Sequence, residues 1–240
     1  MSDASDTLND FASEPLGARR VVVLISGSGS NLQALIDEQT HDRLGGEIVA
    51  VISNEPDAYG LVRAREAGID AVVLPHREYE NRDAYDGALI KVIERHEPDL
   101  IVLAGFMRIL TPRFVQRFLG RMLNIHPSLL PDYQGLDTHA RALADGVAEH
   151  GCSVHFVTEE LDGGPVVIQA AVDVAEGESE ASLKEKVHAR EHLIYPIAVK
   201  WFLEGRLQFV PGGATLDGMP LPAQGVRLSH ADAAEELDEE

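Results

Sequence analysis

Cysteine is nearly absent from this sequence, since Cys152 is the only one in 240 residues. A single cysteine cannot form an internal disulfide, which fits a reducing compartment, and it is more typical of a small buried residue than of a nucleophile. Apolar runs are short, and residues 1–10 lack the basic and apolar segments of a signal peptide. We therefore expect a soluble cytoplasmic protein that does not bind a membrane.

Positive charge is the second shortage. The chain has 20 basic and 40 acidic residues, a formal net charge of -20, and its only lysines are at positions 91, 184, 186 and 200. Nucleic acids are bound through basic surface, so a nucleic-acid partner is not expected. Acidity with so little lysine indicates a cytoplasm rich in salt, where mobile ions screen the repulsion between carboxylates. An ordinary acidic enzyme is the alternative.

Common catalytic and cofactor signatures are missing as well. The histidines show no metal-ligand spacing with Cys152, so no metal is expected, and no Gly-x-Ser-x-Gly stretch occurs. The stretch 26–31, Ser-Gly-Ser-Gly-Ser-Asn, has neither the Gly-Lys pair of a Walker loop nor the third small residue of a dinucleotide fold.

What the sequence does contain is a regular alternation of short apolar runs and longer amphipathic stretches. The runs, rich in β-branched residues, predict strands at 21–25, 48–52, 71–74, 100–104, 122–125, 154–157, 166–174 and 207–210. The amphipathic stretches predict helices at 32–40, 61–67, 82–96, 111–118 and 182–203. The alternation predicts an α/β fold with one doubly wound, mostly parallel sheet, in a single domain of residues 19–225. Residues 1–18 and 226–240 are acidic and are predicted to be tails.

The loop after the first predicted strand contains only small and polar residues. Its backbone N–H groups can surround an anion where the loop opens a helix, and ligands of such sheets bind at the carboxyl ends of the strands. We therefore expect a single phosphate there. The alternative is that Ser30 or Asn31 only caps the helix.

A polar pair stands at the end of the strand predicted at 122–125. Strand side chains alternate, so Asn124 and His126 project to the same side, and Pro127 and Pro131 restrict the loop that follows. Histidine offers a proton near neutral pH and asparagine offers a fixed N–H donor. The pair suits a reaction in which a carbonyl oxygen becomes negative while an amine loses a proton. A structural hydrogen-bonded pair is the alternative.

Asp162 lies in a loop with two glycines after a later strand. A carboxylate beside His126 would favour the charged imidazolium, although Asp-Gly is also a common turn pair. Asn124, His126 and Asp162 are thus the candidate catalytic residues.

Several motifs in one order then point to a family. They are Ile-Ser-Gly-Ser-Gly-Ser-Asn-Leu at 25–32, Leu-Ala-Gly-Phe-Met-Arg-Ile-Leu at 103–110, Asn-Ile-His-Pro-Ser-Leu-Leu-Pro at 124–131, Ser-Val-His-Phe-Val-Thr at 153–158 and Leu-Asp-Gly-Gly-Pro at 161–165. Over residues 20–225 the chain resembles the folate-dependent formyltransferases, especially those acting on glycinamide ribonucleotide. The resemblance implies transfer of the formyl group of 10-formyltetrahydrofolate to the amino group of that ribonucleotide, in purine synthesis, by a monomer or homodimer. Asp137 departs from the family pattern, which usually has a histidine there.

The resemblance also implies which residues bind the two substrates. The phosphate of the ribonucleotide would meet Gly29, Ser30 and Asn31, and the same substrate would meet His188, Ala189, Arg190 and Glu191, with Glu191 on the ribose hydroxyls. The folate would lie against Arg82, Met107, Arg108, Ile109, Leu110, Asn124, Thr158, Glu159, Glu160, Leu161 and Asp162. Core packing is the alternative for Met107, Ile109 and Leu110, and solvated surface charge is the alternative for the two arginines.

Two relatives would share this site. A formyltetrahydrofolate hydrolase would use water in place of the amine, but we expect it to carry a regulatory domain ahead of the first strand. An initiator-tRNA formyltransferase would need an RNA-binding domain. A non-catalytic ligand-binding regulator and a dinucleotide oxidoreductase are alternatives from other classes.

Overall fold

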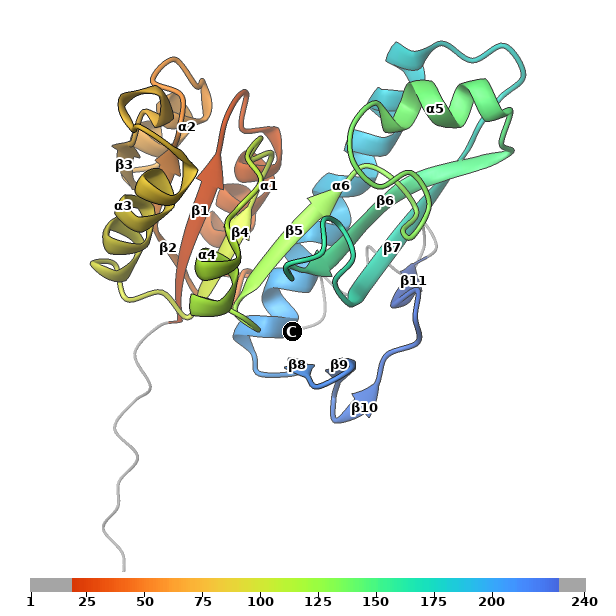
Figure 1. The fold of residues 1–240 in the computed structure, drawn as a ribbon. Helices are drawn as coiled ribbons and strands as arrows, with labels where there is room; N and C mark the ends of the chain where they lie inside the picture. Colours follow the sequence, from red (N-terminus) through yellow and green to blue (C-terminus); the bar gives the residue numbers. More distant parts are fainter. Residues whose placement is uncertain (1–18, 229–240) are drawn as a thin grey trace, which may run out of the picture.

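The structure is a computed structural model that describes residues 19–228 of the chain. Figure 1 shows a central twisted sheet whose strand order is β11-β7-β6-β5-β4-β1-β2-β3. Its strands are β1 (Arg20–Ile25), β2 (Glu47–Ser53), β3 (Asp70–Val73), β4 (Leu100–Leu103), β5 (Met122–His126), β6 (Glu149–Phe156), β7 (Val166–Asp173) and β11 (Val226–Leu228). Neighbouring strands are parallel except where β6 pairs with β5 and β7. The predicted α/β fold with a mostly parallel sheet is confirmed.

Helices cover both faces of this sheet. They are α1 (Ser30–Thr40), α2 (Gly60–Glu66), α3 (Arg82–Glu94), α4 (Pro112–Arg117), α5 (Thr138–Asp145) and α6 (Glu180–Leu203). A 3-10 turn, His76–Glu78, precedes α3, and a small sheet of β8 (Leu207–Val210), β9 (Gly213–Leu216) and β10 (Met219–Pro220) follows α6. No helix among residues 19–228 is long and apolar enough to cross a membrane.

The apolar runs are explained by this double cover. In β1, Val21 and Val23 pack with α1, α2 and α6, while Val22 and Leu24 pack with α3 and α4, and all four side chains are fully buried. A strand with both faces buried needs apolar residues at every position, whereas a strand with one wet face alternates. The uninterrupted apolar run 21–24 therefore indicates a strand and also indicates that helices cover both faces of its sheet.

Helix starts follow local capping chemistry. Asn81 accepts a hydrogen bond from the Ala84 N–H at the start of α3, and Thr111 caps α4 just before Pro112. Such caps satisfy N–H groups that the first helical turn leaves free. The helices predicted at 82–96 and 182–203 are confirmed, with ends that differ by two residues or fewer.

Several elements differ from the prediction. Helix α5 and the short strands β9 and β10 were not expected. Strand β6 begins at Glu149, five residues earlier than predicted, because the residues before its apolar run are mostly polar or small. Val226–Leu228 of the predicted tail pairs in parallel with β7, so the boundary predicted after residue 225 falls short of the last strand of the sheet. The remaining residues of both predicted tails lie outside the described part of the chain.

Candidate active site

Ser26, the first residue after β1, ties three strand ends together. Its hydroxyl donates to the Asn54 side-chain oxygen at 2.5 Å, just beyond β2, and accepts from the Met107 N–H at 2.8 Å, beyond β4. These strands are parallel, so their carboxyl ends share one edge of the sheet. The bonds fix the relative positions of the glycine-rich loop and the segment around Met107, both of which the sequence assigns to ligand binding.

Asn124 and His126 lie on the same side of β5, as strand geometry requires. Asn124 faces His155 across the antiparallel β5–β6 pair, and its Nδ2 lies 3.0 Å from the His155 Nε2. The other ring nitrogen of His155 lies 2.9 Å from the Phe156 carbonyl, which can only accept, so Nδ1 carries the proton and Nε2 accepts from Asn124. This contact leaves one N–H of the Asn124 amide for a ligand.

His155 belongs to the same group of side chains, and the sequence reasoning missed it. Its side chain is buried, and this burial lowers the pKa of its imidazole to about 4, so the ring is neutral at physiological pH. A neutral ring can accept the bond from Asn124, whereas a charged ring could not. Strand alternation could have revealed it, since antiparallel pairing of 153–156 with 123–126 places His155 opposite Asn124.

His126 is held from two sides. Its Nε2 lies 2.9 Å from the Tyr133 carbonyl oxygen, and its Nδ1 lies 3.5 Å from a carboxylate oxygen of Asp162. The His126 side chain is only 7% exposed and that of Asp162 only 10%. The Gly135 N–H also donates to Asp162 at 2.9 Å. Both imidazole nitrogens thus face acceptors, and these two contacts fix the orientation of the ring.

Asp162 does not come from the sheet edge at which the parallel strands end. Strand β6 runs antiparallel to β5 and ends at the opposite edge. Residues 157–165 form the connection between β6 and β7, and this loop folds back so that Asp162 meets His126 and lies 3.8 Å from His155. The predicted proximity of Asp162 to His126 is therefore present in the structure.

The glycine-rich loop is shaped by close backbone packing. Gly29 has φ 70, a left-handed conformation that disfavours residues with a side chain, and it directly precedes α1. A Cβ atom on Gly29 would lie 2.7 Å from the Gly60 Cα, and the Gly60 N–H donates to the Gly27 carbonyl at 3.0 Å. The N-terminus of α1 therefore presents a compact loop of small residues, as expected for an anion site.

Asn31 joins this loop to α6. Its amide donates to the Glu191 carboxylate at 2.8 Å, both side chains are buried, and the Asn31 side-chain oxygen has no partner among the described residues. Burial raises the pKa of Glu191 to about 7, against the lowering effect of the bond from Asn31. Glu191 is thus brought beside the predicted phosphate loop.

The other residues expected at this substrate lie on the same helix, α6. His188 is half-buried and stacks on His192, Arg190 is half-buried, and Ala189 is exposed.

The residues expected to bind folate fall into two groups. Met107, Ile109 and Leu161 are 73%, 58% and 53% exposed, so core packing, the alternative for the first two, does not apply. Leu110 is half-buried and packs against the core. The Arg108 guanidinium lies over the Tyr85 ring at 4.6 Å, and its buried Nε has no partner among residues 19–228.

The other members of the predicted folate set are less defined by the structure. Arg82 begins α3 and is exposed, with no contact that ties it to His126 among the described residues. Glu159 accepts a hydrogen bond from Gln116, Thr158 donates within its own loop, and Glu160 is exposed. The structure therefore leaves the roles of these residues as predictions.

Known proteins are similar to this chain over most of its length. The Formyl transferase family matches residues 19–199. Phosphoribosylglycinamide formyltransferase of Escherichia coli K12 is 55% identical over 205 residues, which are 85% of this chain and 97% of that protein. The human trifunctional purine biosynthetic protein adenosine-3 is 46% identical over 205 residues, which are 85% of this chain and 20% of that longer protein.

A solved structure is similar over the same region. Phosphoribosylglycinamide formyltransferase from Coxiella burnetii superimposes with a TM-score of 0.85 at 50% identity, covering 88% of this chain and 100% of that one. The family match, the sequence identity and the fold agree, and the chain belongs to the formyl transferase family.

Proposed function

We propose that this enzyme transfers the formyl group of 10-formyltetrahydrofolate to the amino group of glycinamide ribonucleotide, as a step of purine biosynthesis. The proposal rests on the position of Asn124, His126 and Asp162 on one side of β5. The glycine-rich loop 26–31, which suits a phosphate, follows β1 of the same sheet. The matched E. coli relative bears the name of this activity and is covered almost completely.

The ribonucleotide binds at the N-terminus of α1. Backbone N–H groups of Gly29, Ser30 and Asn31 hold its phosphate, because a helix N-terminus favours a negative charge. Glu191 receives the ribose hydroxyls, for which its buried carboxylate next to Asn31 is suited. His188, Ala189 and Arg190 complete this side of the substrate.

The folate lies on the exposed apolar side chains near the catalytic residues. Met107, Ile109 and Leu161 give a largely apolar surface for a flat pterin ring, which is the usual composition of such ligand sites. The unpaired Nε of Arg108 supplies a donor for a folate oxygen or nitrogen. Arg82, Leu110 and residues 158–160 belong to the same proposed surface.

Formyl transfer then proceeds by addition and elimination. The amine nitrogen attacks the formyl carbon, a new C–N bond forms, and the carbonyl oxygen becomes an oxyanion. The free N–H of Asn124 and an N–H of His126 turned from the Tyr133 carbonyl donate to that oxyanion. Donors placed in advance around a developing charge lower the barrier because they need little reorganisation.

Proton transfer completes the reaction. The attacking amine loses a proton, the folate nitrogen gains one, and the bond between this nitrogen and the formyl carbon breaks to release tetrahydrofolate. Asp162 keeps His126 oriented, and it lies close enough to this ring to order a water that relays the proton. General acid help of this kind is worth about a hundredfold to ten-thousandfold in rate.

The hydrolase alternative is not favoured. The relatives named above carry formyltransferase or purine-synthesis names, and the E. coli formyltransferase is covered over 97% of its length.

We propose in addition that the enzyme works in the cytoplasm, as a monomer or homodimer, with small-molecule substrates, no nucleic acid and no metal.

The amine decides between transfer and hydrolysis in a direct experiment. The enzyme is incubated with 10-formyltetrahydrofolate, with and without glycinamide ribonucleotide, and tetrahydrofolate is followed together with formylglycinamide ribonucleotide. Tetrahydrofolate should form only with the ribonucleotide and in equal amount to the formylated product. Release without the amine would indicate a hydrolase, and no release in either case would argue against an enzyme of this class.

A further inference from the structure

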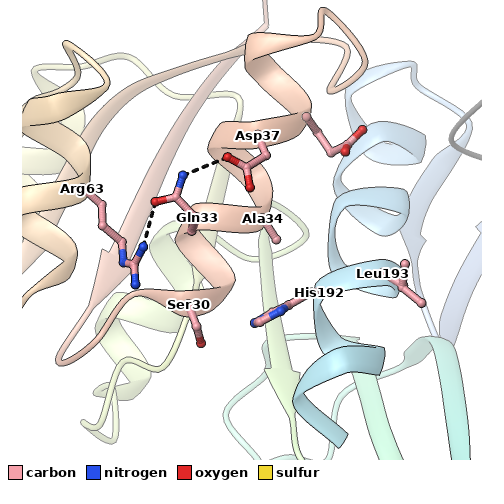
Figure 2. A pocket seen from close by; sticks show the side chains of 8 residues that line it. Ser30, Gln33, Ala34, Asp37, Arg63, His192 and Leu193 are labelled. Atoms are coloured by element: carbon pink, nitrogen blue, oxygen red, sulfur yellow. Dashed lines mark hydrogen bonds between the residues drawn. The ribbon is translucent and has the colours of Figure 1, made fainter. Parts of the chain in front are cut away.

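A pocket of about 350 Å³ lies beside the N-terminal half of α1, between this helix and α6. Figure 2 shows Ser30 at its lower end, with His192 of α6 and Arg63 of α2 on either side of α1. The residues that line the pocket are Ser30, Gln33, Ala34, Asp37, Glu38, Arg63, His192 and Leu193. Negative charge lies at one end of the pocket, where Asp37 and Glu38 stand about two turns along α1 from Ser30. Positive charge lies at the other end, where Arg63 stands near the start of α1.

The Arg63 side chain extends from α2 to the start of α1, where all its hydrogen-bond partners among the described residues are neutral. Its Nε donates to the Ser28 carbonyl at 2.9 Å and its Nη1 donates to the Gln33 side-chain oxygen at 2.9 Å. Gln33 in turn donates to Asp37 at 2.8 Å, so an amide separates the arginine from the carboxylate, as Figure 2 shows. No carboxylate lies within ion-pair distance of Arg63 among residues 19–228. Its positive charge is therefore available to a ligand.

The packing of α2 sets this position. Gly60 begins α2 directly against the glycine-rich loop, and Arg63 follows one turn later, with its Cδ 3.5 Å from where a Cβ of Gly29 would lie. The Tyr59 ring supports the guanidinium from another side at 5.0 Å. Three contacts thus hold one cation next to Gly29 and Ser30, with the outer Nη2 unbonded to any described residue.

A cation beside the glycine-rich loop would favour the binding of a dianionic phosphate. The chain carries a formal net charge of -20, and residues 26–31 contain no basic side chain. Within this loop, only backbone N–H groups and neutral side chains are available to the phosphate. His192 adds little charge, because burial, His188 and Arg63 lower the pKa of its imidazole. Its buried Nε2 has no partner among the described residues, so it stays available as a neutral donor or acceptor.

We infer that Arg63 is the residue that recognises the charge of the substrate's phosphate, with its guanidinium next to the backbone donors of the glycine-rich loop. The inference rests on the proposed function and assigns to Arg63 a role in binding, not in the chemical step. An arginine that only braced the Ser28 carbonyl would support the loop for any substrate. A phosphate-recognising arginine matters only when the phosphate is present.

The test compares two substrates, glycinamide ribonucleotide and the unphosphorylated glycinamide riboside. With the ribonucleotide, Arg63→Gln should raise KM at least about tenfold and leave kcat nearly unchanged, since one charge-assisted contact is lost. With the riboside, kcat/KM should equal that of the wild type. Arg63→Lys should recover part of the loss, because lysine keeps the charge but lacks the forked donors.

Arg65→Gln is the matched control, since it removes the same charge from an exposed position on the same helix. Its KM for the ribonucleotide should not change. Inhibition by inorganic phosphate gives a second readout, and its inhibition constant should rise in Arg63→Gln only. An equal loss with both substrates, or no loss with either, overturns the role of Arg63. Failure of the wild type to formylate the ribonucleotide would instead overturn the proposed function.

Discussion

The proposed chemistry depends most on the carboxylate group of Asp162. Asp162→Asn keeps the shape and an oxygen for the Gly135 N–H but removes the charge beside His126. We expect kcat to fall by about a hundredfold or more, because the variant loses the group that orients His126 and orders the relay water. His126→Ala should lower kcat at least as much, because it removes a donor to the oxyanion. Steady-state kinetics with both substrates saturating measures the effect.

The control for this experiment is Asp132→Asn, which removes a carboxylate from an exposed position in the loop after β5. Its kcat should stay close to that of the wild type. Thermal unfolding should show similar melting temperatures for all three variants, so that lost activity is not lost fold. Turnover near the wild-type value in Asp162→Asn or His126→Ala would contradict the assigned roles.

Glu191 carries a pH dependence whose sign follows from its burial. Its pKa is raised from 4.5 to about 7 in the folded protein, so the folded state binds more protons than the unfolded state between these values. Stability contributed by the neutral carboxyl is therefore present below pH 4.5 and is lost as pH rises through 7. At about 1.4 kcal/mol for each unit of pKa difference, the loss is at most about 3.5 kcal/mol.

Glu191→Gln tests this sign. Glutamine resembles the protonated acid and can still accept from Asn31, so we expect an unchanged melting temperature at pH 4.5 and a higher one at pH 8 than the wild type has. The same variant should bind the ribonucleotide less well if the carboxylate holds the ribose. A variant that melts lower than the wild type at pH 8 would show that the charged form is stabilising.

At the scale of the element, the loop between β6 and β7 decides whether Asp162 meets His126. A Cβ atom on Gly164 would lie 1.9 Å from the Phe156 carbonyl oxygen, which belongs to the backbone of β6 and cannot move away easily. Gly164→Ala must therefore displace the loop. We expect lower kcat and a lower melting temperature, because an overpacked site typically costs about 1–3 kcal/mol.

Gly163→Ala is the matched variant for the same loop. The three atoms nearest to its Cβ would all belong to the Glu160 side chain, with the Cγ at 2.4 Å, and Glu160 is exposed and can turn away. Activity and melting temperature should stay close to the wild type. If both variants lose activity equally, loop sequence rather than the backbone contact at Gly164 controls the position of Asp162.

Sequence reasoning succeeds for elements whose pattern is local. Strand β1 was readable because both of its faces are buried, and α3 and α6 because their lengths and caps are typical of helices. It failed for β6, because its apolar run does not reveal its direction or its polar first half. Helix α5 has only eight residues and starts after Asp137 in a left-handed conformation, so no capping bond marks its beginning.

The site divides in the same way. Asn124 and His126 follow from alternation along one strand, whereas His155 becomes visible only once a second strand is paired in the correct direction. The bond from Asn31 to Glu191 joins residues 160 positions apart and needs α1 and α6 to be placed side by side. Distances such as these depend on packing, which residue spacing does not encode.

At the scale of the whole molecule, the formal net charge of -20 is the property that most needs an explanation. Mutual repulsion among carboxylates destabilises a compact state, and mobile ions screen it over about 10 Å at 0.1 M salt and about 3 Å at 1 M. We expect the melting temperature to rise as KCl is increased from dilute to molar. Sucrose, which screens no charge, should not reproduce a rise that appears below 0.5 M KCl.

A charge-reduced variant separates screening from general salt effects. Three exposed acidic residues have carboxylates without a hydrogen-bond or ion-pair partner among residues 19–228, namely Asp57, Glu66 and Glu185. Changing all three to amides therefore removes repulsion without breaking a described side-chain contact. This variant should melt higher than the wild type in dilute buffer, and the difference should shrink as KCl rises, because salt already screens what the substitutions remove. A melting temperature that falls with KCl, or a difference independent of KCl, would argue for an ordinary acidic enzyme.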